Sequence, residues 1–157
     1  IFYNHKNTGR PEGFYESVFI TKYLDSPNQP LFPFGYGLSY TTFEYSEIQM
    51  EDKRLTRDGK LNVSVKVKNT GKYKGTETVQ LYIRDLVASV TRPVKELKSF
   101  RKVELKRGEE KKVEFVITEK DLRFWNDKKQ FISEPGKFHL FIGTDSENVK
   151  KAEFVLL

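Results

Sequence analysis

The chain has 157 residues, which allows one domain with a tail or two very small domains and is long enough to bury a core without staples. It has no cysteine, so disulfide frameworks and thiolate chemistry are excluded, and no apolar run approaches the ~20 residues that span a bilayer. The formal net charge is +6, and its excess is clearest between Lys95 and Lys112.

The first 45 residues show little regular periodicity and are rich in Asn, Gly, Pro and aromatic residues. Structureless loops beyond ~12–15 residues are uncommon in compact domains, so we interpret residues 1–45 as a connecting arm that runs over a partner body. The main domain is then predicted at residues 46–157. Because the chain begins with Ile1 rather than Met, we expect the natural N-terminus, with any signal peptide, to lie upstream.

The most apolar part of the arm is Leu31-Phe-Pro-Phe-Gly-Tyr-Gly-Leu-Ser-Tyr-Thr-Thr-Phe-Glu-Tyr45. Leaving such aromatic side chains in water costs roughly 1.5–3 kcal/mol each relative to burial. Its two glycines permit backbone angles that other residues resist, and its prolines fix φ, so we predict a shaped contact between two bodies. The predicted interdomain contact residues are Phe34, Gly35, Tyr36, Tyr40 and Phe43.

Beyond the arm, apolar and polar residues alternate, which over roughly four to seven residues is typical of half-buried strands. The alternating sets span 61–67, 79–83, 103–105, 113–117, 138–142 and 152–156. Turn signals separate them at Asp58-Gly59, Asn69-Thr-Gly71, Arg107-Gly108 and Pro135-Gly136. Only residues 119–122 are predicted to be helical, for about one turn, with Thr118 as the N-cap.

About seven short strands separated by regular turns predict an all-β fold, an antiparallel β-sandwich. Two sheets of such a fold pack their alternating apolar faces together. Since the chain has no cysteine pair, an antibody-type disulfide is excluded, and a fibronectin type III-like (immunoglobulin-like) topology fits better.

Several motifs occur in the same order as in a known enzyme family. Besides the apolar segment 31–45, they are Tyr3-Asn-His-Lys-Asn-Thr-Gly-Arg-Pro11, Asn69-Thr-Gly71, Val79-Gln-Leu-Tyr82, Ser89-Val-Thr-Arg-Pro-Val-Lys-Glu-Leu97, Glu134-Pro-Gly-Lys-Phe138 and Ile142-Gly-Thr144. The chain thereby resembles the C-terminal region of glycoside hydrolase family 3 enzymes, above all bacterial periplasmic β-glucosidases. One departure is Ser99, where the family usually has Gly, and this affects the turn geometry expected there.

The resemblance implies a non-catalytic fibronectin type III-like module of an enzyme that hydrolyses terminal β-linked glycosides with retention of configuration. The family places its nucleophilic Asp in an N-terminal barrel and its acid/base Glu in an α/β domain, and no residue here matches either motif. The implied partners are those two domains of the same chain, which the module packs on and stabilises. The implied location is the periplasm or the exterior of the cell.

Candidate binding residues are few. His5 and His139 are the only histidines, so a multi-histidine metal site is excluded, and no cofactor is expected. His139 is predicted to be a partly exposed surface residue. His5 is expected to hydrogen-bond to the missing domain or to point at its substrate cleft.

Two aromatic residues are candidate sugar contacts. Trp125, in Arg123-Phe-Trp-Asn-Asp127, is either a sugar-stacking platform or a plug at one end of the sandwich, and the plug is favoured because Trp is highly buried on average. Tyr82 is out of phase with the core set, so its ring is expected to face solvent or a partner. Asp121 and Asp127 are a weak carboxylate pair, since turn and capping uses of Asp are common.

Two further function classes remain open. The alternative to an enzyme module is a freestanding carbohydrate- or surface-binding sandwich that uses Trp125, Tyr82 and the basic face. The basic stretch 95–112 also suits nucleic acid, but its interspersed glutamates favour a solvated strand face, so no nucleic-acid partner is expected. The apolar arm is a possible site of self-association.

Overall fold

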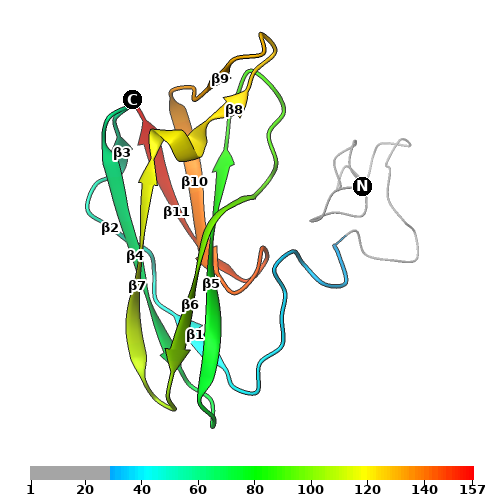
Figure 1. The fold of residues 1–157 in the computed structure, drawn as a ribbon, viewed down its shortest axis with the longest axis vertical. Helices are drawn as coiled ribbons and strands as arrows, with labels where there is room; N and C mark the ends of the chain where they lie inside the picture. Colours follow the sequence, from blue (N-terminus) through cyan, green and yellow to red (C-terminus); the bar gives the residue numbers. More distant parts are fainter. Residues whose placement is uncertain (1–28) are drawn as a thin grey trace, which may run out of the picture.

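The computed structural model describes residues 29–157, which form a β-sandwich with a short arm ahead of it (Figure 1). The predicted fold class is confirmed. The elements are β1 (Phe43–Tyr45), β2 (Gln49–Met50), β3 (Arg54–Leu55), β4 (Lys60–Asn69), β5 (Gly75–Asp85), β6 (Glu96–Leu105), β7 (Glu110–Thr118), the 3₁₀ helix η1 (Glu119–Leu122), β8 (Phe124–Trp125), β9 (Phe131–Ile132), β10 (Gly136–Gly143) and β11 (Val149–Leu156).

Two main sheets make the sandwich. In the first, β4 pairs with β1, β2 and β7, and the second has the order β3-β11-β10-β5-β6. All neighbours are antiparallel except β3 and β11. Since β1, β2 and β3 are successive pieces of one edge run that passes from the first sheet to the second, the main sheets contain about seven strand runs, as predicted.

The core lies between the sheets and contains the alternating residues that the sequence pattern selected. The described cluster comprises Leu55, Leu61, Val63, Val65, Val67, Val79, Leu81, Ile83, Leu105, Val113, Phe115, Ile117, Leu122, Phe138, Leu140, Ile142, Phe154 and Leu156. Phe138 and Phe154 stack across β10 and β11 with ring centroids 5.3 Å apart. Burying each large apolar side chain contributes roughly 1.5–3 kcal/mol, which makes this interior the main source of stability.

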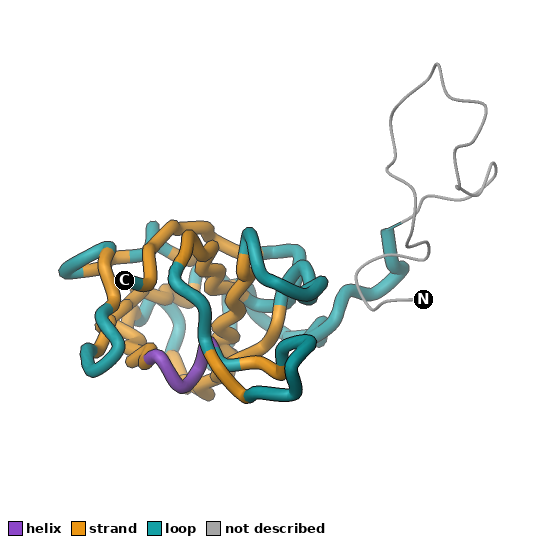
Figure 2. Tube along the Cα trace, turned by 90° about the horizontal axis from the view of Figure 1, so that it is seen from above, coloured by secondary structure: helices purple, strands orange, loops and turns teal. Residues whose placement is uncertain are grey.

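The N-terminal edge of the sandwich begins earlier than the sequence suggested. β1 pairs with β4 in the register Phe43↔Asn69 and Tyr45↔Val67, and Phe43 packs against the core. The sandwich therefore extends upstream of the boundary predicted at residue 45. Seen from above the sandwich, the described part of the arm leaves from one edge (Figure 2).

The single predicted helical turn is present. The Asp121 carboxylate accepts hydrogen bonds from the Thr118 backbone N–H and hydroxyl, both at 2.7 Å, so Thr118 begins η1 with a capping box. Asp121, one of the two residues of the weak carboxylate pair, is therefore a capping residue.

Near Ser99 the structure has a strand rather than a turn. Ser99 pairs with Leu81 inside β6, and the next pair is Tyr82↔Leu97, so one extra residue forms a β-bulge there. The expectation of an altered turn at Ser99 is corrected, because the residue beside a bulge stays in extended backbone.

Several exposed basic residues in and beside β6 and β7 pair with acidic neighbours. Lys111 lies 3.3 Å from Glu109 and Lys74 lies 2.9 Å from Glu104. Exposed ion pairs of this kind contribute about 0–1 kcal/mol. Their arrangement supports the interpretation of this stretch as a solvated strand face.

No helix in the described region is long and apolar enough to cross a membrane.

Candidate interdomain contact site

The arm makes a tight turn just before it reaches the second sheet. The Tyr36 backbone N–H donates to the Pro33 carbonyl at 3.1 Å, and Gly35 has φ +82°. A glycine with positive φ at the third position is characteristic of a type II turn. The Pro-Phe-Gly-Tyr segment thus fixes the direction of the arm locally.

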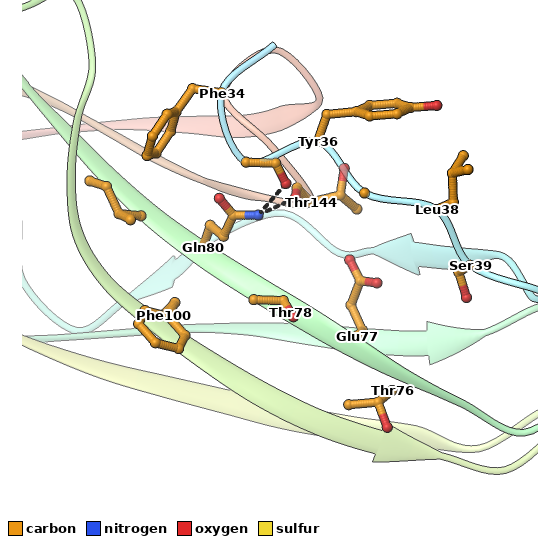
Figure 3. A pocket seen from close by; sticks show the side chains of 13 residues that line it. Phe34, Tyr36, Leu38, Ser39, Thr76, Glu77, Thr78, Gln80, Phe100 and Thr144 are labelled. Atoms are coloured by element: carbon orange, nitrogen blue, oxygen red, sulfur yellow. Dashed lines mark hydrogen bonds between the residues drawn. The ribbon is translucent and has the colours of Figure 1, made fainter. Parts of the chain in front are cut away.

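The turn docks on the outer face of β5 through its backbone carbonyls (Figure 3). The Gln80 side-chain amide donates to the Gly35 carbonyl at 3.0 Å and also to the Thr144 carbonyl. The Tyr82 hydroxyl donates to the Gln80 side-chain oxygen and lies 3.4 Å from the Phe34 carbonyl. These contacts, which we call the arm-docking site, join the arm to β5 and to the β10–β11 loop.

Tyr82 lies beneath this turn and is only 1% exposed. As predicted, its ring is outside the core cluster. Of the two surroundings expected for the ring, solvent or a partner, solvent is excluded, because Phe34 of the arm covers the ring edge-on at 6.4 Å between centroids. Burial, with a smaller effect of the Asp145 charge, raises the pKa of Tyr82 to about 12. A sugar therefore has no access to this ring while the arm is docked.

The loop between β10 and β11 completes the arm-docking site. The Ser146 backbone N–H donates to the Phe34 carbonyl at 2.9 Å, and the Lys95 ammonium donates to the Ser146 carbonyl. Asp145 shapes the loop by accepting the backbone N–H groups of Glu147 and Asn148, each at 2.8 Å. Although burial acts in the opposite direction, these donors lower the pKa of Asp145 and keep it charged.

The predicted contact residues divide into three groups. Phe34 and Gly35 lie against β5 of this same domain, whereas Phe43 packs on the sandwich core. Tyr36 is partly exposed and packs on Phe32 at 5.1 Å, and Tyr40 is 96% exposed. A groove of about 460 Å³ remains between the arm and the outer face of β5 and β6. Among the five predicted contact residues, Tyr40 and Tyr36 therefore keep the most exposed side chains, and their neighbours Leu31, Phe32 and Leu38 are exposed as well.

The two predicted sugar-contact residues that the structure describes, Tyr82 and Trp125, lie in different sheets. Trp125 is 65% exposed on β8, so the favoured prediction of a plug is wrong; the buried residue of this strand is Phe124. His139 is partly buried and lies 3.0 Å from Glu153, and burial lowers its pKa. His5 lies outside the described residues.

Sequence reasoning missed the residues that hold the arm. Gln80 occupies an outward strand position between two core residues, where polar residues are ordinary, and Lys95 and Ser146 lie in loops. Their roles depend on which segment covers them, and no local pattern carries that information.

Among the residues that the structure describes, no group of three or more acidic or histidine side chains is placed to hold a metal ion.

A buried acid near the arm leads to a pH prediction. Glu77 accepts a hydrogen bond from the Tyr45 hydroxyl at 2.7 Å, and burial raises its pKa despite that bond. The folded state thus holds this proton more tightly than the unfolded chain, so this carboxylate destabilises the fold as pH rises above the unfolded pKa. Glu77→Gln, which still accepts from Tyr45, is expected to raise the free energy of unfolding at pH 7.5 but not at pH 4.

Urea unfolding at the two pH values measures this effect. Glu104→Gln is the control, because the Glu104 side chain is 61% exposed and its replacement should change little at either pH. A Glu77→Gln protein that is no more stable than the parent at pH 7.5 contradicts the assignment.

The comparisons with known proteins agree with this geometry. Residues 77–146 match the fibronectin type III-like domain family. The chain is 48% identical over 158 residues to a periplasmic beta-glucosidase of Salmonella typhimurium, covering all of this chain and 21% of the relative. It is 54% identical over 123 residues to beta-glucosidase BoGH3A of Bacteroides ovatus, covering 78% of this chain and 16% of the relative.

A solved structure shows the same fold at similar identity. The beta-glucosidase from Listeria innocua, solved in complex with glucose, superposes with a TM-score of 0.88 at 42% identity and covers 99% of this chain. This chain spans 22% of that protein, and about a fifth of the curated relatives' length. The chain therefore belongs with the C-terminal fibronectin type III-like domains of glycoside hydrolase family 3 proteins.

Proposed function

We propose that the chain is a non-catalytic module of a longer β-glucosidase-type enzyme whose other domains hydrolyse terminal β-linked glycosides with retention of configuration. The observation that carries this is the full-length match of the chain to only 21% of a β-glucosidase sequence. Retaining glycosidases need two carboxyl groups about 5–5.5 Å apart. The family resemblance assigns both groups to domains outside this chain.

The role proposed for the module is to pack on the catalytic domains and hold them in place. The arm-docking site supports this, because it fixes the backbone of Phe34 and Gly35 on β5 while Tyr36 and Tyr40 keep outward surface. Catalytic geometry tolerates little looseness, so a firmly anchored connector suits a positioning role.

The activity is tested with the full-length protein. We expect it to release 4-nitrophenol from 4-nitrophenyl β-D-glucoside and to give the β-anomer of glucose as the first product by NMR. No cleavage of aryl β-glucosides or β-xylosides, or an α-anomer first, would refute the assigned reaction.

The clamping role is tested by the double variant Phe34→Ala/Tyr36→Ala of the full-length protein. Losing two partly buried aromatic rings should lower the melting temperature, and looser positioning should reduce turnover about tenfold. Unchanged stability and turnover would remove the clamping role without affecting the assigned reaction.

Location and assembly are proposed on narrower grounds. One relative is named as a periplasmic enzyme, so we place the full-length protein in the periplasm or outside the cell, which cell fractionation tests. Self-association of the separate chain through its arm stays a prediction, and light scattering of that chain measures it.

A further inference from the structure

A second exposed aromatic surface lies far from the arm in sequence, on the short β8–β9 hairpin. Trp125 is 65% exposed and Phe131 is 49% exposed, and their ring centroids lie 5.4 Å apart. Trp is highly buried on average, so an exposed Trp packed on an exposed Phe is unusual for a surface that stays in water.

Hydrogen bonds and packing at the base of the hairpin hold the Trp125–Phe131 pair in place. Arg123 binds the Glu119 carboxylate at 2.9 and 3.0 Å, and the Ser133 hydroxyl donates to the same carboxylate at 2.6 Å. Next to Trp125, buried Phe124 carries the Arg92 guanidinium 4.6 Å above its ring. A surface ordered in advance loses less conformational entropy when it is covered, which favours a contact role.

Contacts connect the hairpin to the arm through the β5–β6 loop. The Ser89 backbone N–H donates to Glu134, just after β9, at 2.8 Å, and at the other end of the loop Lys95 donates to Ser146, which in turn binds Phe34. Figure 1 shows the hairpin, this loop and the arm on the same side of the sandwich. Val87 in this loop is also exposed, at 82%.

The occupant that fits best is protein rather than sugar. Within the hairpin, the Gln130 backbone N–H donates to the Asn126 side-chain oxygen at 2.9 Å, and the Asn126 amide lies 3.3 Å from the Gln130 side-chain oxygen, so these bonds order the loop that carries the two rings. Since the chain spans 21% of a curated relative, a large body of protein is expected on the arm's side.

We propose that Trp125 and Phe131 are a second contact with the rest of the full-length protein, so that the sandwich is held at two points, the arm and the β8–β9 hairpin. The inference rests on the proposed function for the existence of a larger body and assigns it a contact surface. Two separated points restrict rotation of the sandwich more than the arm contact alone.

Hydroxyl-radical footprinting of the full-length protein, read by mass spectrometry, tests this directly. We expect Trp125 and Phe131 to be oxidised at least about fivefold more slowly in the native protein than in urea, because the centre of a protein interface excludes water. Oxidation of native Trp125 at nearly its rate in urea overturns the proposal. So does protection that develops only after cello-oligosaccharides are added, which would assign the pair to sugar. The readout needs no turnover, so it stays informative if the assigned reaction fails.

A variant gives an independent measurement. Trp125→Ala in the full-length protein should lower the melting temperature by roughly 2–4 °C. The matched control is Val116→Ala, an exposed apolar residue on β7 of the first main sheet, which should shift the melting temperature by much less. Equal shifts in the two variants count against the second contact, and the footprint of the unmodified protein decides if Trp125→Ala does not fold.

Discussion

Replacing Asn69 with alanine is expected to lower the free energy of unfolding by about 3–5 kcal/mol, because several buried groups lose their partner at once. Asn69 is 0% exposed. Its amide donates to the Tyr73 carbonyl at 2.8 Å and the Leu105 carbonyl at 3.0 Å. Its side-chain oxygen accepts from the Thr41 hydroxyl at 2.7 Å and the Gly71 N–H at 3.1 Å.

The size of this effect comes from the number of segments that meet at Asn69. The Asn69 side chain bonds to the end of the arm, the β4–β5 turn and the end of β6. The Asn69 backbone N–H and C=O both bond to the β6–β7 turn. The sequence marked Asn69-Thr-Gly71 as a turn signal. The structure shows that the Asn is also a buried polar centre, which a turn propensity does not indicate.

Urea denaturation measures the loss, with Asn62→Ala as the matched control. Asn62 is an exposed asparagine on the same strand whose amide lies 3.4 Å from Glu51, so its removal should cost within about 0.5 kcal/mol. Asn69→Asp separates the two halves of the network, since it keeps acceptor oxygens but cannot donate to the two carbonyls. If Asn69→Ala and Asn62→Ala unfold at the same urea concentration, the network has no energetic role.

The sandwich was predictable because strand faces are encoded locally. The alternation of Val63, Val65 and Val67 with polar residues predicts that one face of the strand is buried, and these valines do lie in the core between the sheets. The capped turn at Thr118 was predictable for the same reason, since capping depends on residues within one turn.

What covers an outer face is decided by segments distant in sequence. Tyr82 has the phase of a surface residue, yet it is buried because the arm, some 48 residues earlier, passes over it. Trp125 shows the reverse, since the average preference of Trp for burial predicted a plug, while in the structure Trp125 is exposed and the neighbouring Phe124 is buried. In both cases the local sequence does not indicate which other residues cover the side chain or leave it exposed.

Replacing Gly35 with alanine is expected to release the arm from β5. The residue has φ +82°, which costs a residue with a side chain roughly 1–2 kcal/mol. A Cβ there would lie 2.0 Å from the Gln80 side-chain oxygen and 2.7 Å from the Tyr82 hydroxyl. Gln80 has little freedom to move, because it is buried and bonded to Gly35, Thr144 and Tyr82.

The arm or Gln80 must therefore move, and the bonds to the Phe34 and Gly35 carbonyls are lost. We expect the free energy of unfolding to fall by about 2–3 kcal/mol, with faster amide exchange across residues 34–40. If the proposed clamping role holds, the same change should also reduce turnover of the full-length protein.

Gly37→Ala is the matched control for this change. It lies two residues along the same segment, and no described heavy atom lies within 4 Å of its added Cβ. Since alanine also has less backbone freedom in the unfolded chain, this control should be neutral or stabilising by about 0.4–1 kcal/mol. Equal amide exchange and equal turnover in Gly35→Ala and Gly37→Ala would mean that the docked turn does not hold the arm. A selective loss in Gly35→Ala would instead locate the coupling in the contact between the turn and β5.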